Sequence, residues 1–375
     1  MIAFNKPYLS GKETEYISTA VSSGKISGDG MFTKKCHEFF EKKYGFKKVL
    51  LTTSCSDALE MAAILLDIKE GDEVIVPSFT FVSTANAFVL RGAKIVFADC
   101  ETDTPNIDVN KLEALVTPKT KAIVPVHYAG MACDMDAIMA LANKHNLFVV
   151  EDAAQAIDSD YKGKPLGSFG HLAAFSFHET KNIISGEGGM LVINDDRFLL
   201  RAEIIREKGT NRSAFFRGET DKYGWVDIGS SFLPSDIIAA FLFAQLENLD
   251  DIQQRRKKIW DNYYKGLSLL QEKGLVELPV LPAYAVNNAH MFYIVCKSLE
   301  ERTALIAKLK SEQIGAVFHY ISLHSSAYYQ DKHDGRPLPY ADKYTNCLLR
   351  LPFYYELKEE DQQKVIRTIL SFYGL

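Results

Sequence analysis

The sequence predicts an α/β protein, with a mostly parallel sheet in a large N-terminal domain and a smaller α+β domain after it. Short strands alternate with helical stretches from about Lys48 onward, which implies βαβ units joined by right-handed crossovers. The strands are rich in Val and Ile with few polar interruptions, so both of their faces are expected to be buried. The pattern changes after about Leu233, where a long helix precedes a smaller mixed segment.

Seven strands are expected in the large domain. They are Val49–Thr53, Glu73–Val76, Lys94–Ala98, Lys121–Val126, Leu147–Val150, Ala173–Phe177 and Met190–Asn194. The helices expected between them are Ser56–Ile68, Val82–Arg91, Asp108–Val116 and Asp134–Asn146. The polar and aromatic stretch Gly209–Gly224 lacks periodicity, so we expect a long loop there, of the kind that is often functional.

The C-terminal part starts with a helix over Ser235–Leu249, which is expected to continue, with a kink, through the basic stretch Gln254–Lys258. After Pro279 and Pro282 we expect strands His290–Cys296 and Val317–Ile321, and helices Leu299–Lys310 and Glu359–Tyr373. The last helix has apolar residues at i, i+3, i+4 and i+7, which gives it one buried face. A domain boundary near residue 250 follows, with domains 1–250 and 251–375.

The length, charge and cysteine content of the chain exclude several classes of protein. A chain of 375 residues is longer than a single core usually supports. The net charge of −5 gives no footprint for nucleic acid or for an anionic membrane surface, and no apolar run is long enough to span a bilayer. The start of the chain lacks a signal-peptide core, and its six scattered cysteines include no CxxC. We therefore expect a cytoplasmic protein with reduced thiols and no nucleic-acid or membrane partner.

Lys181 and Asp152 are the first candidates for catalysis. Lys181 follows the strand that ends near Phe177 and precedes a glycine-rich turn at Gly186–Gly189, and Asp152 follows the strand Leu147–Val150. This arrangement suits pyridoxal phosphate, because a lysine forms the Schiff base with its aldehyde. An aspartate pairs with the pyridinium nitrogen and keeps it protonated. The ordinary alternatives are a solvated surface lysine and a helix-capping aspartate.

A phosphate site is expected where a strand turns into a helix at Thr52–Ala58, around Cys55 and Ser56. The alternative is a plain helix cap by Ser54 or Ser56. Asp57 argues against a phosphate there unless its carboxylate faces solvent.

Three further side chains are candidates for cofactor contacts. Phe81 follows the second strand and could stack on a planar ring, although core packing is the ordinary role. Gln155 lies one helical turn after Asp152, within reach of a phenolic oxygen. The hydroxyl of Ser176 could reach a phosphate or cap a buried carbonyl.

No metal site is expected, because His127 and Cys133 lack partners at ligand spacing. The sequence has no P-loop and no N-terminal GxGxxG, which disfavours a nucleotide-fold oxidoreductase.

The order and spacing of these segments are more specific than any one of them. Over nearly its whole length the chain resembles the sugar-nucleotide aminotransferases of the DegT–StrS group, which are pyridoxal phosphate enzymes of fold type I. The segments that carry the resemblance are Gly28–Gly30, Thr53–Leu59, Pro77–Thr84, Val126–Gly130, Glu151–Ala156, Phe175–Lys181, Gly186–Gly189 and Ser235–Ala240.

The resemblance implies a role for each candidate residue. Lys181 would be the Schiff-base lysine and Asp152 the pyridinium partner, while Gln155 would contact the cofactor's hydroxyl and Phe81 its ring. The backbone of Cys55 and Ser56, together with the Ser176 hydroxyl, would hold the phosphate, although the family usually has Gly-Thr in place of Cys55-Ser56. The family also supplies an Asn from the partner subunit, and Ser231 would have to replace it here.

The same resemblance, with the segments Arg206–Arg212, Asn288–Tyr293 and Val317–Tyr320, implies one reaction. Glutamate would aminate dTDP-4-dehydro-6-deoxy-D-glucose to dTDP-4-amino-4,6-dideoxy-D-galactose for lipopolysaccharide or other surface polysaccharide, in a homodimer with shared active sites. The C4 epimer, a 3-amino sugar and a pyridoxal phosphate-binding regulatory protein stay open as alternatives. Family members that remove water from the sugar have a histidine at the position of Lys181, so lysine favours transamination.

Six residues are candidates for binding the nucleotide sugar. Arg212 and Arg217, with Lys222 beside them in the long loop, could hold its diphosphate, and solvated loop cations are the alternative. His319, Tyr320 and His324 could line the sugar pocket, and core or surface roles are equally open.

Overall fold

The structure is a computed structural model that describes residues 1–375, and its centre is a seven-stranded sheet. The strands run in the order β1-β9-β8-β5-β4-β2-β3. Their bounds are β1 Lys48–Thr52, β2 Glu73–Pro77, β3 Lys94–Ala98, β4 Thr120–Ile123, β5 Phe148–Asp152, β8 Leu172–Ser176 and β9 Gly189–Ile193. Four neighbouring pairs are parallel, and only the two pairs that β9 makes are antiparallel. The predicted α/β class with a mostly parallel sheet is confirmed.

Both faces of this sheet are covered by helices, which explains the unbroken apolar strands. Successive strand residues belong to different cores: Val149 lies in one cluster and Val150 in the other. Helices α3 (Cys55–Leu65) and α4 (Val82–Val89) cover the face of Val150. The opposite face packs against α2 (Met31–Tyr44), α5 (Met135–His145) and α8 (Asp236–Leu246), and α1 (Glu13–Ser22) lies on α8.

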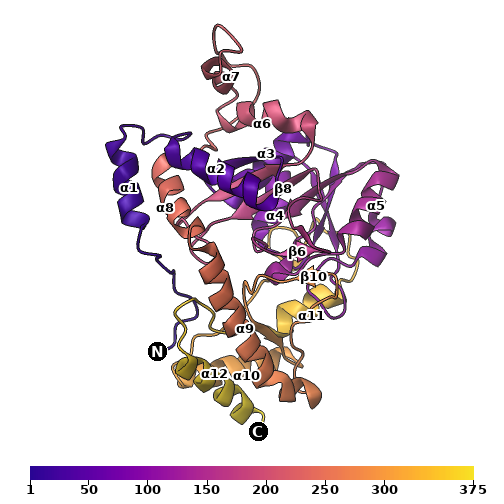
Figure 1. The fold of residues 1–375 in the computed structure, drawn as a ribbon. Helices are drawn as coiled ribbons and strands as arrows, with labels where there is room; N and C mark the ends of the chain where they lie inside the picture. Colours follow the sequence, from indigo (N-terminus) through magenta and orange to yellow (C-terminus); the bar gives the residue numbers. More distant parts are fainter.

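The long helix α9 (Leu249–Glu272) connects the sheet to the C-terminal part of the chain (Figure 1). The expected single helix is interrupted, because α8 ends at Leu246 and a new helix starts at Leu249. The start of α9 buries Leu249 and Ile252 in the large core, and its later turns bury Ile259 and Tyr263 in the C-terminal core. The division into domains 1–250 and 251–375 therefore cuts the first turn of α9 and stays a prediction.

The C-terminal part is a small antiparallel sheet with helices against it. The strands lie in the order β11-β13-β12, with β11 Tyr293–Val295, β13 Leu348–Arg350 and β12 Val317–Phe318. Its helices are α10 Leu299–Ser311, α11 Pro339–Cys347 and α12 Glu359–Phe372. The predicted strands here are shorter than expected, and α11 was not expected.

The N-terminal segment belongs to this C-terminal part in space (Figure 1). The Ile2 amide donates to the Gln313 carbonyl at 2.8 Å, and the Ile2 carbonyl accepts from the Gly315 amide at 2.9 Å. The Phe353 amide donates to the Phe4 carbonyl at 3.0 Å. The first residues are thus fixed beside loop segments of the C-terminal part.

Two expected elements differ from the structure. The helix expected over Asp108–Val116 is instead two 3-10 turns, Val109–Lys111 and Glu113–Leu115. The expected loop Gly209–Gly224 contains the short helix α7 (Arg212–Phe216), and it projects with α6 (Leu199–Arg206) from one end of the molecule (Figure 1). We call residues 209–228 the arm.

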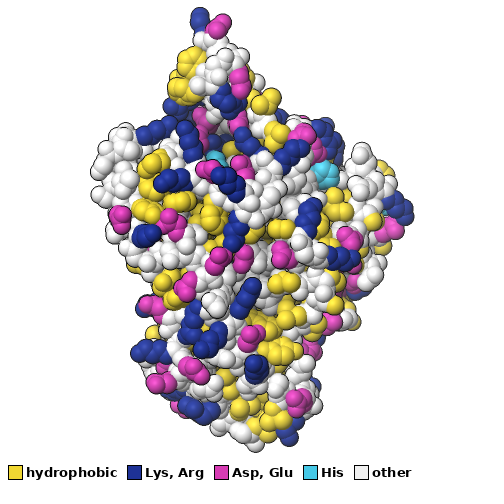
Figure 2. Space-filling model, viewed as in Figure 1, with side chains coloured by type: hydrophobic (Ala, Val, Ile, Leu, Met, Phe, Trp, Pro, Cys, Tyr) yellow, Lys and Arg dark blue, Asp and Glu magenta, His cyan; other side chains and the backbone are white.

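A small sheet of two-residue strands completes the fold, in the order β10-β6-β7. It comprises β6 Asp160–Tyr161, β7 Lys164–Pro165 and β10 Ala285–Val286. None of the helices combines the length and the hydrophobicity that a bilayer crossing requires. Acidic and basic side chains are mixed over the face drawn in Figure 2, without a large patch of one sign.

Candidate active site

A cavity of about 590 Å³ lies where the sheet meets the C-terminal part of the chain. It opens at the carboxyl ends of β2, β5 and β8, the edge at which open α/β sheets bind ligands. Nine of the residues predicted for the site line it. They are Cys55, Ser56, Phe81, Asp152, Gln155, Ser176, Lys181, His319 and Tyr320.

The N-terminus of α3 forms one wall of the cavity. Ser54 caps the helix, since its hydroxyl accepts from the Asp57 amide at 3.0 Å, and the amides of Cys55 and Ser56 have no partner within the chain. The Asp57 carboxylate accepts from the Thr53 hydroxyl and does not line the cavity. The positive end of a helix with two free amides is suited to an anion.

Gly189 allows this helix to approach the sheet. A Cβ at Gly189 would overlap with the Ser54 carbonyl and the Cys55 amide nitrogen. The glycine-rich turn after Lys181 is therefore required for the position of the anion site, in addition to its role as a turn.

Lys181 projects into the cavity without a hydrogen-bond or ion-pair partner for its Nζ. Its backbone amide donates to the His178 carbonyl at 2.9 Å, which holds the turn that carries it. Burial lowers the pKa of Lys181, and the charge of Arg350 adds to that effect, while Cys55 and Asp152 oppose it. At a given pH, the amine of Lys181 is therefore neutral in a larger fraction of the molecules than the amine of an exposed lysine is.

Asp152 is buried at the end of β5, and both of its carboxylate oxygens are fixed. Oδ2 accepts from the Thr84 hydroxyl at 2.7 Å, and Oδ1 accepts from the Ala154 amide at 3.1 Å. Burial raises the pKa of Asp152, against these two hydrogen bonds and the charge of Lys181. A cation in the cavity would favour the ionised carboxylate.

The neighbouring Glu151 points to the opposite face of β5 and is fully buried. Its carboxylate accepts from the amides of Gly167, Phe169 and Gly170 at 2.7 to 2.8 Å and lies 3.0 Å from Nε2 of His127. Burial alone would raise the pKa of Glu151, but these bonds, above all that from His127, hold it below its ordinary value.

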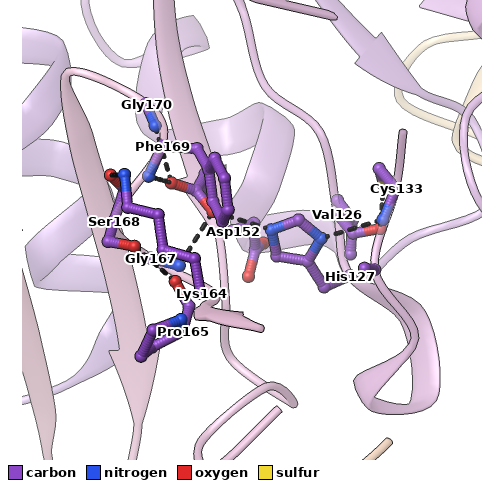
Figure 3. A network of polar contacts seen from close by, with 12 residues as sticks. Val126, His127, Cys133, Asp152, Lys164, Pro165, Gly167, Ser168, Phe169 and Gly170 are labelled. Atoms are coloured by element: carbon purple, nitrogen blue, oxygen red, sulfur yellow. Dashed lines mark hydrogen bonds and ion pairs between the residues drawn. The ribbon is translucent and has the colours of Figure 1, made fainter. Parts of the chain in front are cut away.

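The hydrogen bonds of this network define the tautomer of His127. Its Nδ1 accepts from the Cys133 amide at 3.2 Å, so the ring proton is on Nε2, where it donates to Glu151 (Figure 3). His127 and Glu151 therefore have structural roles behind the strand.

The side chain of Gln155 is fixed by two hydrogen bonds in the cavity wall, close to a second pair of buried polar groups. Its Oε1 accepts from the Ala129 amide at 2.6 Å, and its Nε2 donates to the Tyr320 hydroxyl at 3.1 Å. The Tyr128 hydroxyl lies 2.8 Å from Nδ1 of His319, whose pKa burial lowers well below its ordinary value. One N–H of Gln155 stays free for a ligand.

Phe81 is 56 % exposed at the start of α4 and lines the cavity, with its ring centroid 6.1 Å from that of Tyr320. It is therefore available to a planar ligand, and core packing does not explain its position.

Four predicted residues lie elsewhere. Ser231, Arg212 and Arg217 do not line the cavity. Arg217, on the arm, pairs with Glu203 of α6 and with Glu219. The His324 ring is 2.7 Å from the Ser78 hydroxyl and 3.5 Å from Asp342. His324 thus links the end of β2 to the C-terminal part.

Several residues that line the cavity were not predicted from the sequence. They are Phe4, Asn5, Thr80, His178, Thr180, Glu187, His290, Met291, Arg350 and Phe353. One signal was available for Arg350, which is a lone charge in the apolar run Leu348–Leu351. Nothing in the sequence placed Phe4 and Asn5 beside Lys181.

Comparison with known proteins gives a consistent result. The model of the DegT/DnrJ/EryC1/StrS aminotransferase family matches residues 7–370. The spore coat polysaccharide biosynthesis protein SpsC of Bacillus subtilis is 35% identical over 380 residues, covering 98% of this chain and 96% of SpsC.

Two solved structures have the same fold over their full length. Spr1654 of Streptococcus pneumoniae in its PLP form has a TM-score of 0.91 and 27% identity, covering 100% of this chain and 98% of its own. PseC of Helicobacter pylori, an aminotransferase involved in the biosynthesis of pseudoaminic acid, has a TM-score of 0.90 and 25% identity, covering 100% and 99%.

Proposed function

Because the chain belongs to the DegT/DnrJ/EryC1/StrS aminotransferase family of pyridoxal phosphate-dependent sugar aminotransferases, we propose that it aminates a nucleotide-linked keto sugar. The substrate proposed is dTDP-4-dehydro-6-deoxy-D-glucose, the donor glutamate and the product dTDP-4-amino-4,6-dideoxy-D-galactose. The unpartnered amine of Lys181, in one cavity with the buried carboxylate of Asp152, is the observation that carries the proposal.

The residues of the large domain fit pyridoxal phosphate. The free amides of Cys55 and Ser56, at the helix end that Gly189 allows to approach, would hold its phosphate with the Ser176 hydroxyl. Asp152 would face the ring nitrogen.

Two more residues would fix the plane of the ring, and one would hold the cofactor covalently. Gln155 has one free N–H for the ring hydroxyl, and the exposed face of Phe81 suits a stacked ring. Lys181 would bind the aldehyde.

Pyridoxal phosphate, when bound, supplies an electron-accepting ring that makes a proton on the adjacent carbon easier to remove. Lys181 would move that proton, since its Nζ is the basic atom without a partner in the cavity. The lowered pKa of Lys181 suits a general base, because more of the amine is neutral near neutral pH.

The cavity wall formed by the C-terminal part of the chain would hold the sugar. His319 and Tyr320 line the cavity with neutral polar groups, which can donate and accept hydrogen bonds with sugar hydroxyls without adding charge. His324 would act indirectly, since it fixes this wall to Ser78.

The arm supports a homodimer with shared active sites. Its side chains Phe216 and Trp225 are 68 % and 85 % exposed, which is unusual for large aromatic groups unless another surface covers them. We propose that the arm of one subunit reaches the cavity of its partner and brings Arg212 and Arg217 toward the diphosphate, and that the residues following the arm bring Ser231 toward the cofactor phosphate. Sedimentation of the purified protein as a monomer, with full activity, would refute this arrangement.

The function is tested by mixing purified protein with glutamate and dTDP-4-dehydro-6-deoxyglucose and identifying the product. Mass spectrometry should show a ketone replaced by an amine, and NMR ring couplings should show an axial amine at C4. An equatorial amine at C4 or an amine at C3 would replace the proposed product with one of its isomers. If neither glutamate nor the amino sugar changes the cofactor's absorbance, the protein is not a transaminase and a regulatory role is favoured.

A further inference from the structure

Two buried threonine hydroxyls, from Thr80 and Thr84, form a chain that ends on the carboxylate of Asp152. We propose that this chain keeps Asp152 ionised and directs it at the ring nitrogen of pyridoxal phosphate. Thr80 and Thr84 are then positioning residues for the transamination. The inference rests on the part of the proposed function that pairs Asp152 with the ring nitrogen.

The hydroxyl chain has a single direction. The Thr84 hydroxyl donates to Oδ2 of Asp152 at 2.7 Å, and its oxygen lies 2.9 Å from the hydroxyl oxygen of Thr80. A hydroxyl has only one proton to donate, and that of Thr84 goes to Asp152, so Thr80 is the donor in the second bond. Both O–H dipoles therefore point toward the carboxylate. A hydroxyl that accepts one hydrogen bond also donates a stronger one, so Thr80 strengthens the bond from Thr84.

The start of α4 carries this chain, and a helix cap does not explain it. Thr84 lies in the first turn of α4, where threonine hydroxyls often bond to the backbone of their own helix. The Thr84 hydroxyl instead donates to β5, to a residue 68 positions later in the sequence. Phe81, which lines the cavity, lies between the two threonines. One short segment therefore provides both the face for the cofactor ring and the hydroxyls that fix Asp152.

Burial makes the bond from Thr84 important for the charge of Asp152. Thr80, Thr84 and Asp152 are 2 %, 0 % and 5 % exposed. Burial raises the pKa of Asp152, and the hydrogen bond from Thr84 is the largest of the effects that oppose this rise. A donor to the carboxylate favours its ionised form, which is the form that pairs with a protonated ring nitrogen. Loss of the Thr84 hydroxyl would therefore weaken that pairing and leave the groups assigned to the phosphate in place.

The test compares pyridoxal phosphate with an analogue in which C–H replaces the ring nitrogen. Each is titrated into the cofactor-free protein, and the ratio of the two dissociation constants measures what the ring nitrogen contributes to binding. We expect the wild type to bind pyridoxal phosphate more tightly than the analogue.

Three variants should change this ratio to different extents. Thr84→Val, which removes the hydroxyl and nearly keeps the shape, should reduce the ratio by about tenfold, through weaker binding of pyridoxal phosphate alone. Thr84→Ser should restore most of the ratio, because it restores the donor. Thr80→Val should reduce the ratio by about threefold, since Thr80 acts only through Thr84.

Thr33 provides the matched control. Its hydroxyl donates to the carboxylate of Asp236 at 2.8 Å, both residues are fully buried, and neither lines the cavity. Thr33→Val therefore removes the same kind of bond at a place that serves only the fold. It should lower the melting temperature, as Thr84→Val does, and leave the ratio of dissociation constants unchanged.

Three outcomes in the variants would overturn the proposal. An unchanged ratio in Thr84→Val would show that its hydroxyl does not influence the pairing of Asp152, and an unchanged ratio in Thr80→Val has the same meaning if Thr84→Val does not fold. Equal weakening of both ligands would show a purely structural role. A larger effect from Thr80→Val than from Thr84→Val would show that Thr80 contacts the cofactor itself.

Failure of the proposed function has a different signature. A wild type that binds both ligands equally would refute the pairing of Asp152 with the ring nitrogen, and this inference with it. A wild type that distinguishes them, with variants that do so equally well, would refute the role of the threonines alone.

Discussion

The two faces of strand β5 differ in how completely their polar groups are paired. Behind the strand, Glu151 has four hydrogen-bond partners and His127 has one on each ring nitrogen. In front of it, the Lys181 amine, the Cys55 and Ser56 amides and Arg350 Nε lack partners. Adjacent carboxylates on one strand therefore have different roles. Glu151, on the side where every polar group is paired, stabilises the fold, whereas Asp152 lies on the side where unpaired groups are available to ligands; we call these the closed side and the open side of β5.

The largest effect is expected from Lys181→Ala, which removes the central group of the open side. Turnover should fall by about 10000-fold or more, because both the covalent attachment and the base are lost. Borohydride treatment should no longer label the peptide containing residue 181. The melting temperature of the cofactor-free protein should stay close to that of the wild type, since the Nζ makes no contact that stabilises the fold. Full activity in this variant would remove the basis of the mechanism.

A matched pair of substitutions on β5 tests the comparison directly. Asp152→Asn should lower kcat by about 100-fold, with little change in the stability of the cofactor-free protein. Glu151→Gln should instead lower the free energy of unfolding by about 3 kcal/mol and change kcat little. Each Glu151 oxygen accepts from two donors, so in either orientation the NH₂ group of the glutamine would face two N–H groups. Urea unfolding and steady-state kinetics of both variants give the result. If the two substitutions have the same profile, the two faces are not functionally distinct.

Gly189→Ala, a substitution on β9, should weaken the anion site by displacing the start of α3. The added methyl overlaps with the helix start, so the helix must shift, at a cost of about 1–3 kcal/mol in stability. The amides of Cys55 and Ser56, which we assign to the phosphate, would move with the helix. The affinity of Gly189→Ala for pyridoxal phosphate should therefore be lower than that of other variants with the same loss of stability. Gly266→Ala in α9, where the added methyl meets the Ile366 side chain in the C-terminal core and away from the cavity, is the control. Fluorescence titration of the cofactor-free protein measures both.

The smallest effect is a displaced pH profile for cofactor attachment. Burial lowers the pKa of Lys181 from 10.5, so its neutral, nucleophilic form becomes abundant at a lower pH than that of an exposed lysine. The rate at which pyridoxal phosphate attaches should therefore rise with pH, with a midpoint below 10.5. Arg350→Gln should move that midpoint upward, because it removes a positive charge that disfavours protonated Lys181. A midpoint at or above 10.5 in the wild type would contradict the description of the cavity.

Much of the large domain could be predicted because its signals are local. Apolar strands such as Glu73–Pro77 and the strand-end positions of Asp152 and Lys181 are evident in short windows of sequence. The family, the fold class and pyridoxal phosphate as the cofactor are confirmed by the comparisons.

The features that the sequence did not predict depend mainly on packing between distant segments of the chain. His290 and Arg350 reach the cavity only because the C-terminal sheet packs against the large domain, which no local pattern encodes. The helix expected over Asp108–Val116 is only nine residues long and is followed by Pro118. A helix that short is marginal without a strong buried face, and the structure has two 3-10 turns. His324 was a candidate for the sugar pocket, but it does not line the cavity, and its ring lies 2.7 Å from the Ser78 hydroxyl.

The first residues of the chain form part of the cavity wall, and this affects how the protein should be handled. Phe4 and Asn5 line it, and Ile2 is paired between Gln313 and Gly315. An affinity tag cut off with a few residues of overhang at Met1 would stay outside this wall, whereas trimming the start past Phe4 would remove a ring whose centre lies 4.7 Å from the guanidinium carbon of Arg350. Purification through the opposite terminus, after Leu375, leaves this wall untouched.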